Sequence, residues 1–200
     1  MSRRVEVWFL ILPLIYWGFI WGYFIKILPT ATASVSDDRS LLPLTPVING
    51  ASFLIGSVTW NFVIKRAGSI ATVSLATIML LAALVISLLT FPRGAMTEIA
   101  EDLATVETYV TPSAWYVVAI CALIGLADSA VCIVYYTAVG RIWAEDTALG
   151  YSLTQTGFCV FYLLAMTAPS LFDLHVYIYC MAGSVLVMFV SYIFPLRKFL

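Results

Sequence analysis

The sequence predicts an all-α, polytopic membrane protein with six transmembrane helices. Its 200 residues are 62% hydrophobic and only 10% charged, with a mean hydropathy of +1.01, which leaves too few charges to cover a soluble domain. Six segments are long and apolar enough to cross about 30 Å of hydrocarbon as helices. A β-barrel is excluded because its strands alternate in polarity, whereas segments such as 74–89 are apolar on all sides.

We expect a single transmembrane domain over residues 1–200. Within its apolar segments only Glu6, Lys26 and Asp128 carry a charge, and the first two lie near segment ends, where headgroups and water are close. The predicted spans are 5–28, 41–64, 67–91, 114–139, 151–172 and 176–196.

The first span, 5–28, contains a Gly-x-x-x-Gly motif at Gly18 and Gly22. Two glycines one turn apart let another helix backbone approach closely, and we expect this face to pack within the chain in preference to pairing two chains. A secretory signal cleaved after residues 31–33 is the other interpretation of this region. The apolar run is longer than the core of such a signal, which favours a retained span.

The second span, 41–64, has two prolines near its start, and a short basic turn separates it from the third span, 67–91. Proline is common in the first turn of a helix, so a regular helical start is favoured over an unwound segment that lines a cavity. Asn49, just inside the second span, is a secondary polar candidate for a functional site.

Asp128, near the middle of the fourth span, is the most informative residue. An ionised carboxylate there costs at least ~2.5 kcal/mol, so it must face the bundle interior or a wet cavity. Helical spacing places Gly125 and Cys132 near its face. The functional interpretation is a proton or cation site, or a polar contact with a partner helix. The structural one is a buried carboxyl hydrogen-bonded to its neighbours, and the sequence leaves both open.

The fifth and sixth spans, 151–172 and 176–196, are joined by a short turn that holds His175. Gln155 lies in a polar cluster at the start of the fifth span and is the other secondary polar candidate. Such clusters are more typical of hydrogen bonds between helices than of ligand binding.

Lysines and arginines in short loops mark the cytoplasmic side of a membrane protein. With the N-terminus inside, seven basic residues fall on the cytoplasmic side and three outside, so both termini are predicted to be cytoplasmic. The inner set is Arg3, Arg4, Lys65, Arg66, Arg141, Arg197 and Lys198, and the outer set is Lys26, Arg39 and Arg93.

We expect no enzymatic activity, no metal and no cofactor. One histidine and four scattered cysteines do not form a typical cluster of metal ligands. Intramembrane aspartyl proteolysis needs two carboxylates that share a proton, and Asp128 has no second acid at membrane depth. A net charge of -1 without a basic patch argues against nucleic acid as a partner. The lipid bilayer is the partner that the composition itself implies.

Three stretches carry a resemblance to a known family. They are Leu12-Pro-Leu-Ile-Tyr-Trp-Gly18 in the first span, Gly56-Ser-Val-Thr-Trp-Asn-Phe-Val-Ile-Lys-Arg-Ala-Gly68 at the end of the second, and Leu123-Ile-Gly-Leu-Ala-Asp128-Ser-Ala in the fourth, followed by Tyr135-Tyr-Thr-Ala-Val-Gly140. Together they resemble the C-terminal half of the uncoordinated-93-like family of the major facilitator superfamily. The sequence departs from that family at Val131–Val134, where amide side chains are usual.

The resemblance implies one half of a major facilitator fold. In that fold the first and fourth helices of each half line a central cavity, so Gly18, Gly22 and Asp128 are expected to face it. The implied role is regulation of ion channels or escort of membrane receptors, without catalysis. The implied partner is therefore another membrane protein, a channel or a receptor, and a homodimer is the other expected assembly.

A secondary transporter is the alternative hypothesis. The chain then acts as one half of a carrier that is coupled to protons through Asp128. It works either as a dimer or as part of a twelve-span protein, because an isolated half encloses no complete path.

Overall fold

The structure is a computed structural model that describes residues 2–35, 41–95, 108–111, 113–167 and 172–199, with side chains described within 11–33, 41–95, 108–111, 113–167 and 172–193. The regular elements in these ranges are all helical, which confirms the predicted all-α class. They are α1 (Ser2–Gly22), the π-helix η1 (Tyr23–Ile27), α2 (Leu28–Val35), α3 (Leu41–Thr90), α4 (Ala114–Ile142), α5 (Thr147–Thr167) and α6 (Leu174–Phe199).

The first three elements form one continuous helix, because Gly22 and Leu28 on either side of η1 both have helical backbone angles. The helix continues past residue 28, where the predicted first span ends, because α2 runs to Val35. Pro29 is the second residue of α2, and proline is tolerated in the first turn of a helical segment.

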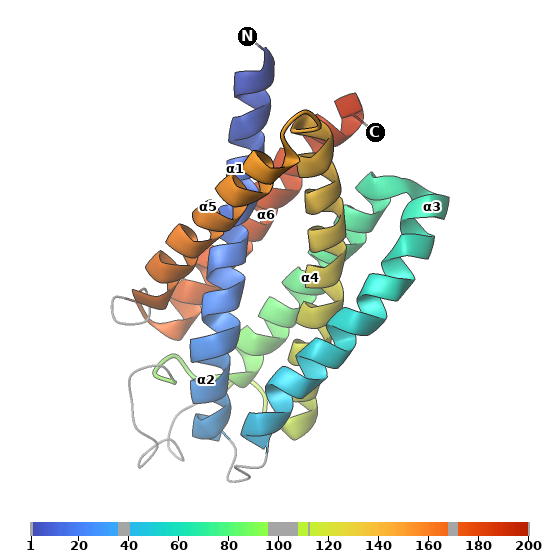
Figure 1. The fold of residues 1–200 in the computed structure, drawn as a ribbon. Helices are drawn as coiled ribbons and strands as arrows, with labels where there is room; N and C mark the ends of the chain where they lie inside the picture. The colour runs from blue at the N-terminus through green and yellow to red at the C-terminus, as the bar shows by residue number, and fades with distance from the viewer. Residues whose placement is uncertain (1, 36–40, 96–107, 112, 168–171, 200) are drawn as a thin grey trace.

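The long element α3 consists of two helices joined at Gly68, whose φ of 83° and ψ of 169° are not helical. Figure 1 shows these two arms of α3 meeting at a sharp turn. The sequence places the break between the two helices at residues 65–66. In the structure Lys65 and Arg66 are still helical, and the break lies at Gly68 instead. The first arm is helical from Leu41 with Pro46 inside it, which confirms a regular start.

The bundle is held together by two groups of helices. α4 packs chiefly against α3, and α1 packs against α5 and α6 (Figure 1). Direct contact between α1 and α4 is less extensive, which leaves space between them. The core is aromatic and aliphatic, with Tyr23, Leu80, Ile120, Tyr177 and Val185 almost completely buried.

A polar contact ties the end of α3 to the start of α6. The Arg93 guanidinium donates from Nε to His175 Nδ1 at 3.2 Å. Because a guanidinium only donates, Nδ1 is the acceptor, and Nε2 carries the proton that it donates to the Phe91 carbonyl at 3.2 Å. His175 thus ties the segment that follows α3 to α6. It is the second residue of α6, whereas the sequence places it in the turn before that helix.

Five helical segments among the described residues are long and apolar enough to cross a membrane: Ile11–Ala33, Leu41–Thr90, Ala114–Ile142, Thr147–Thr167 and Leu174–Ile193. Their outer surfaces are apolar, as shown by Phe62 on α3 and Val190 on α6, each of which is 65% exposed. α5 begins at Thr147, earlier than the predicted residue 151, because Asp146 caps it by accepting a hydrogen bond from the Leu149 N–H at 3.0 Å. Figure 1 shows both chain termini at the same end of the bundle.

Candidate functional site

Asp128 lies on α4 and is only 6% exposed. Its Oδ1 accepts hydrogen bonds from the Trp17 indole N–H at 3.0 Å and from the Tyr16 hydroxyl at 3.4 Å. Both donors are consecutive residues of α1, so the carboxylate joins the two helices where their contact is otherwise limited. Oδ2 accepts no hydrogen bond from any residue that the structure describes.

Aromatic neighbours hold the Trp17 ring in place. The Tyr135 ring meets it edge to face at a centroid distance of 4.8 Å, and the Tyr136 ring lies at 5.6 Å. Both tyrosines are on α4, as is Asp128. The indole is therefore clamped by the same helix whose carboxylate it binds, which fixes the direction of its N–H.

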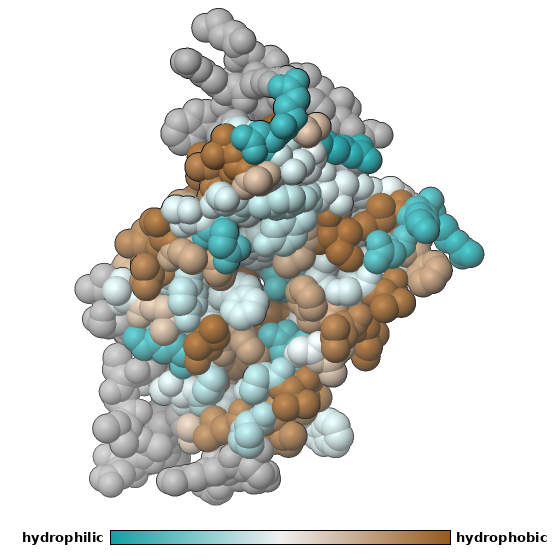
Figure 2. All heavy atoms as spheres, viewed as in Figure 1, coloured by the Kyte–Doolittle hydropathy of each residue, from teal (hydrophilic) through white to brown (hydrophobic). Residues whose placement is uncertain are grey.

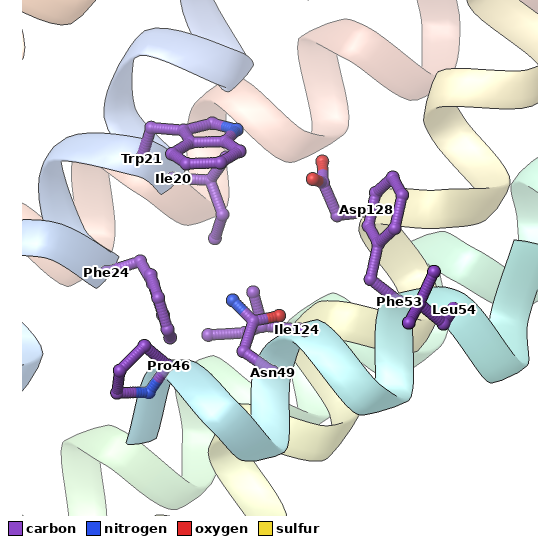
Figure 3. Close-up of a pocket in the computed structure, with 10 residues that line it drawn as sticks. Ile20, Trp21, Phe24, Pro46, Asn49, Phe53, Leu54, Ile124 and Asp128 are labelled. Atoms are coloured by element: carbon purple, nitrogen blue, oxygen red, sulfur yellow. The ribbon is translucent and has the colours of Figure 1, made fainter. Parts of the chain in front are cut away.

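A cavity of about 490 Å³ opens beside the carboxylate; we call it the Asp128 cavity. It lies between α1 with η1, the first arm of α3, and α4 (Figure 3). Asp128 and Asn49 are its two polar side chains. The rest of the lining is Ile20, Trp21, Phe24, Pro46, Gly50, Phe53, Leu54 and Ile124.

A second cavity of about 450 Å³, the aromatic cavity, lies between α1 with η1, α4 and α5. Trp21 borders both cavities, so they are neighbours along α1. The aromatic cavity is lined by Trp17, Trp21, Ile25, Cys132, Tyr136, Gln155, Phe158 and Tyr162. Successive turns of α4 thus supply Ile124 and Asp128 to one cavity and Cys132 and Tyr136 to the other.

The structure distributes most of the predicted site residues over these two cavities. Asn49 joins Asp128 in the first, and Cys132 and Gln155 line the second. Gly125 lies directly against the Asn49 backbone and side chain, so its missing Cβ is what lets α3 and α4 approach beside the Asp128 cavity.

Gly18 and Gly22 lie elsewhere. A Cβ at Gly18 would be 2.5 Å from the Phe161 carbonyl carbon of α5, and one at Gly22 would be 2.9 Å from both the Ala165 Cβ and the Tyr177 hydroxyl. Both glycines therefore face α5 and α6. The resemblance implies that they face a central cavity together with Asp128. In the structure α5 and α6 lie directly against them instead, and neither glycine lines the Asp128 cavity or the aromatic cavity.

The sequence alone does not identify which residues donate to Asp128. The structural interpretation, a carboxyl hydrogen-bonded to a residue such as Thr, Tyr or Gln, agrees with the Tyr16 bond but does not include an indole such as that of Trp17. The only available signal was depth, because Trp17 and Asp128 both lie near the middle of their predicted spans. Lys26 does not compensate the charge, since its Nζ donates to the Met166 carbonyl at 2.9 Å.

Within the described ranges no three side chains of histidine, cysteine, aspartate or glutamate gather in a group that could hold a metal ion. The Asp128 carboxylate and the Asn49 amide are the polar groups at the first cavity, and the Cys132 thiol and the Gln155 amide are among those at the second. This arrangement suits the recognition of a polar or charged group inside apolar walls.

Comparison with protein families identifies what kind of protein carries this site. The family model described as "Ion channel regulatory protein UNC-93" matches residues 2–194. Comparisons with curated proteins and with solved structures give no significant match. The family match confirms the resemblance seen in the motifs of the first, second and fourth spans, and with the apolar helices it identifies an integral, multi-pass membrane protein. The chain belongs to the UNC-93 family of ion channel regulatory proteins.

Proposed function

We propose that this chain is a non-catalytic regulatory partner of an ion channel, with which it associates in the bilayer. The observation that carries the proposal is the family match, which spans residues 2–194 and so includes every helix that borders the two cavities. The chain acts by contact with the channel and carries out no chemistry of its own.

The proposed topology has six crossings with both termini in the cytoplasm, as in one half of a major facilitator fold. The turn at Gly68 supports it, because it divides the 50-residue α3 into two apolar arms. Six crossings return the chain to the side on which it began, in keeping with the common end at which Figure 1 shows the termini.

The proposed contact surface is the cavity face, which we define as the side of the bundle formed by α1, the first arm of α3, α4 and α5. Figure 2 views this side and shows brown apolar patches along both edges with only scattered teal hydrophilic residues. Val58 lies on the first arm of α3, one turn beyond the cavity residue Leu54, and is 64% exposed. A bulky residue there would hold a partner helix away.

The test is recovery of the channel with the chain. The tagged full-length chain is extracted from its native membrane in a mild detergent, and the co-purifying membrane proteins are identified by mass spectrometry. The recovered channel is then co-expressed with the chain, and its current is recorded. We expect a channel subunit in the complex and a change in its current when the chain is present.

A matched pair of variants locates the contact. Val58→Trp on the cavity face is expected to lower the recovery of the channel, whereas Val190→Trp on α6, where the valine is 65% exposed, is expected to leave it unchanged. Recovery of a receptor without any channel would replace channel regulation by receptor escort. Equal recovery with both variants would contradict the assignment of the cavity face.

A proton-coupled carrier half is the second candidate, and one observation favours it: the Asp128 carboxylate borders a cavity at membrane depth. Proton uptake into proteoliposomes, followed with an enclosed pH-sensitive dye, tests it. A flux that is present with the parent chain and absent with Asp128→Asn would support a carrier. The absence of flux, together with a channel in the complex, would eliminate it.

A further inference from the structure

We propose that the Asp128 cavity binds a small organic cation, namely a protonated primary amine with an apolar body. This site goes beyond the regulatory function proposed above and does not depend on it. Three features of the cavity carry the proposal: an incompletely compensated carboxylate, aromatic walls, and a size and lining that suit an organic molecule.

The first feature is the charge. Asp128 is buried, both of its donors bind Oδ1, and Oδ2 accepts nothing from the described part of the chain. No described lysine, arginine or histidine pairs with it, and Lys26 is bound to the Met166 carbonyl instead. A buried carboxylate is stable when a cation and further hydrogen bonds satisfy its oxygens. An ammonium group that donates to Oδ2 supplies both.

The second feature is the aromatic lining. Figure 3 shows Trp21 and Phe24 on one side of the cavity and Phe53 on the other, beside the Asp128 carboxylate. The face of an aromatic ring attracts a cation, and this attraction strengthens where water is excluded. Rings on both sides of a cavity that also holds a carboxylate therefore favour a bound cation over a bound anion or a neutral polar molecule.

The third feature is size and polarity. A volume of about 490 Å³ lies within the range of small-molecule sites. Apart from Asp128 and Asn49, the only polar side-chain group among the ten lining residues is the Trp21 indole N–H. An inorganic cation needs several oxygen ligands that converge on it. Here Asp128 and Asn49 alone offer side-chain oxygens, and the Asn49 Oδ1 lies against Gly125. The apolar remainder of the cavity fits the carbon skeleton of an amine.

The experiment measures binding to the purified full-length chain in lipid nanodiscs, without any channel, by isothermal titration calorimetry at neutral pH. The probe is 2-phenylethylammonium. Its controls are 2-phenylethanol, which has a similar shape without the charge, and 3-phenylpropionate, which has the opposite charge. We expect saturable binding of the ammonium ion, about tenfold or more tighter than that of the alcohol, because a charge-assisted hydrogen bond is lost in the alcohol. No saturable binding is expected for the anion.

Two variants test the residues. Asp128→Asn keeps an oxygen for the Trp17 and Tyr16 donors but removes the charge, and it should weaken ammonium binding about 10- to 100-fold. The matched control is Asp173→Asn, which removes an exposed carboxylate at the start of α6 and should leave binding unchanged. Gel filtration and thermal unfolding check that each variant is folded.

Phe24→Leu keeps an apolar side chain, though a smaller one, and removes a ring, so it tests the aromatic wall without altering Asp128. It should weaken binding of the ammonium ion more than binding of the alcohol, because only the ammonium ion loses a cation–π contact. Equal affinity for the ammonium ion and the alcohol would overturn the proposal, because the cavity would then be merely apolar. Undiminished binding to Asp128→Asn, or displacement of the probe by millimolar potassium, would overturn it as well. Because the binding experiment contains no channel, a negative result would contradict the amine site without contradicting the proposed regulatory function.

Discussion

The Asp128 carboxylate accepts two hydrogen bonds from adjacent residues of α1, Tyr16 and Trp17, and the two bonds differ in length. The Trp17 bond is short, at 3.0 Å, and its ring is held by Tyr135, whereas the Tyr16 bond is 3.4 Å long. We expect Trp17→Phe to destabilise the folded chain by about 1.5–3 kcal/mol, the usual cost of removing a hydrogen bond to a buried charged group. Thermal unfolding of the purified chain in detergent measures this.

The matched control is Trp21→Phe, because Trp21 is 40% exposed and its indole makes no hydrogen bond within the part of the chain that the structure describes. Combining Trp17→Phe with Asp128→Asn should cost less than the sum of the two single changes, since both act on one interaction. Strict additivity would show that the indole does not stabilise the carboxylate.

Glycine is needed at position 18 for space. A Cβ there would lie 2.5 Å from the Phe161 backbone, which cannot move aside as a flexible side chain can, whereas Gly183 has nothing within 4 Å of the same atom. Gly18→Ala should therefore destabilise the chain by about 1–3 kcal/mol by separating α1 from α5. Gly183→Ala should be neutral or stabilising, by up to ~1 kcal/mol, because alanine favours helix. Thermal unfolding of the two variants compares them, and equal melting temperatures would contradict the close packing.

At this scale the sequence predicted some features and not others. The position of Asp128 in an interior followed from the cost of a charge in lipid, which holds for any arrangement of the helices. Its bond to Trp17 depends on how α1 and α4 are rotated about their axes, and no local pattern specifies that. For the same reason the side of α1 that carries Gly18 and Gly22 could not be assigned to a neighbour in advance.

Among the elements, α3 is the one whose shape depends most on a single residue, Gly68. Gly68 has φ 83° and ψ 169°, a region open essentially to glycine alone, so Gly68→Ala should cost about 1–3 kcal/mol. Gly68→Asn should not rescue it, because asparagine tolerates the left-handed helical region and not this one. Thermal unfolding reports the loss. Gly50→Ala in the first arm, where a Cβ meets nothing within 4 Å, is the control and should cause none.

The same turn shows what hydropathy can and cannot locate. The charged pair Lys65 and Arg66 marks where the apolar runs are interrupted, and that is why the sequence predicted the break there. Charged side chains are compatible with a helix, however, and both residues remain helical and exposed. The chain reverses where the backbone permits it, at Gly68. Hydropathy thus found the two arms of α3, and backbone stereochemistry decides where they join.

For the whole molecule, the proposed six crossings place the Gly68 turn and the start of α6 on opposite sides of the membrane. In a chain whose four cysteines are replaced by serine or alanine, Arg66→Cys should react with an impermeant maleimide only from the cytoplasmic side. Asp173→Cys should react only from the outside. Both positions are exposed and outside the bundle core. Labelling of both from one side would exclude the six-crossing topology.

The π-helix η1 marks a position at which the first helix can gain or lose one residue without changing its packing. A π-turn holds one residue more than the α-helical turn it replaces, and such turns are local bulges in an otherwise regular helix. Residues on either side of η1 therefore keep the directions that an uninterrupted α-helix one residue shorter would give them. Loss of one codon within Tyr23–Ile27 would convert η1 to α-helix and leave the neighbours of α1 and α2 unchanged.

Deletion of one residue elsewhere in the helix rotates all residues on one side of the deletion by about 100° about the helix axis relative to those on the other side. Deletion of Ile25 is accordingly expected to give a folded chain with a similar melting temperature. Deletion of Ile15, which turns residues 11–14 away from their neighbours, should destabilise the chain, and gel filtration with thermal unfolding distinguishes the two. If both deletions behave alike, η1 is not a one-residue insertion. Otherwise it marks the one place in the first helix where sequences of different length can specify the same bundle.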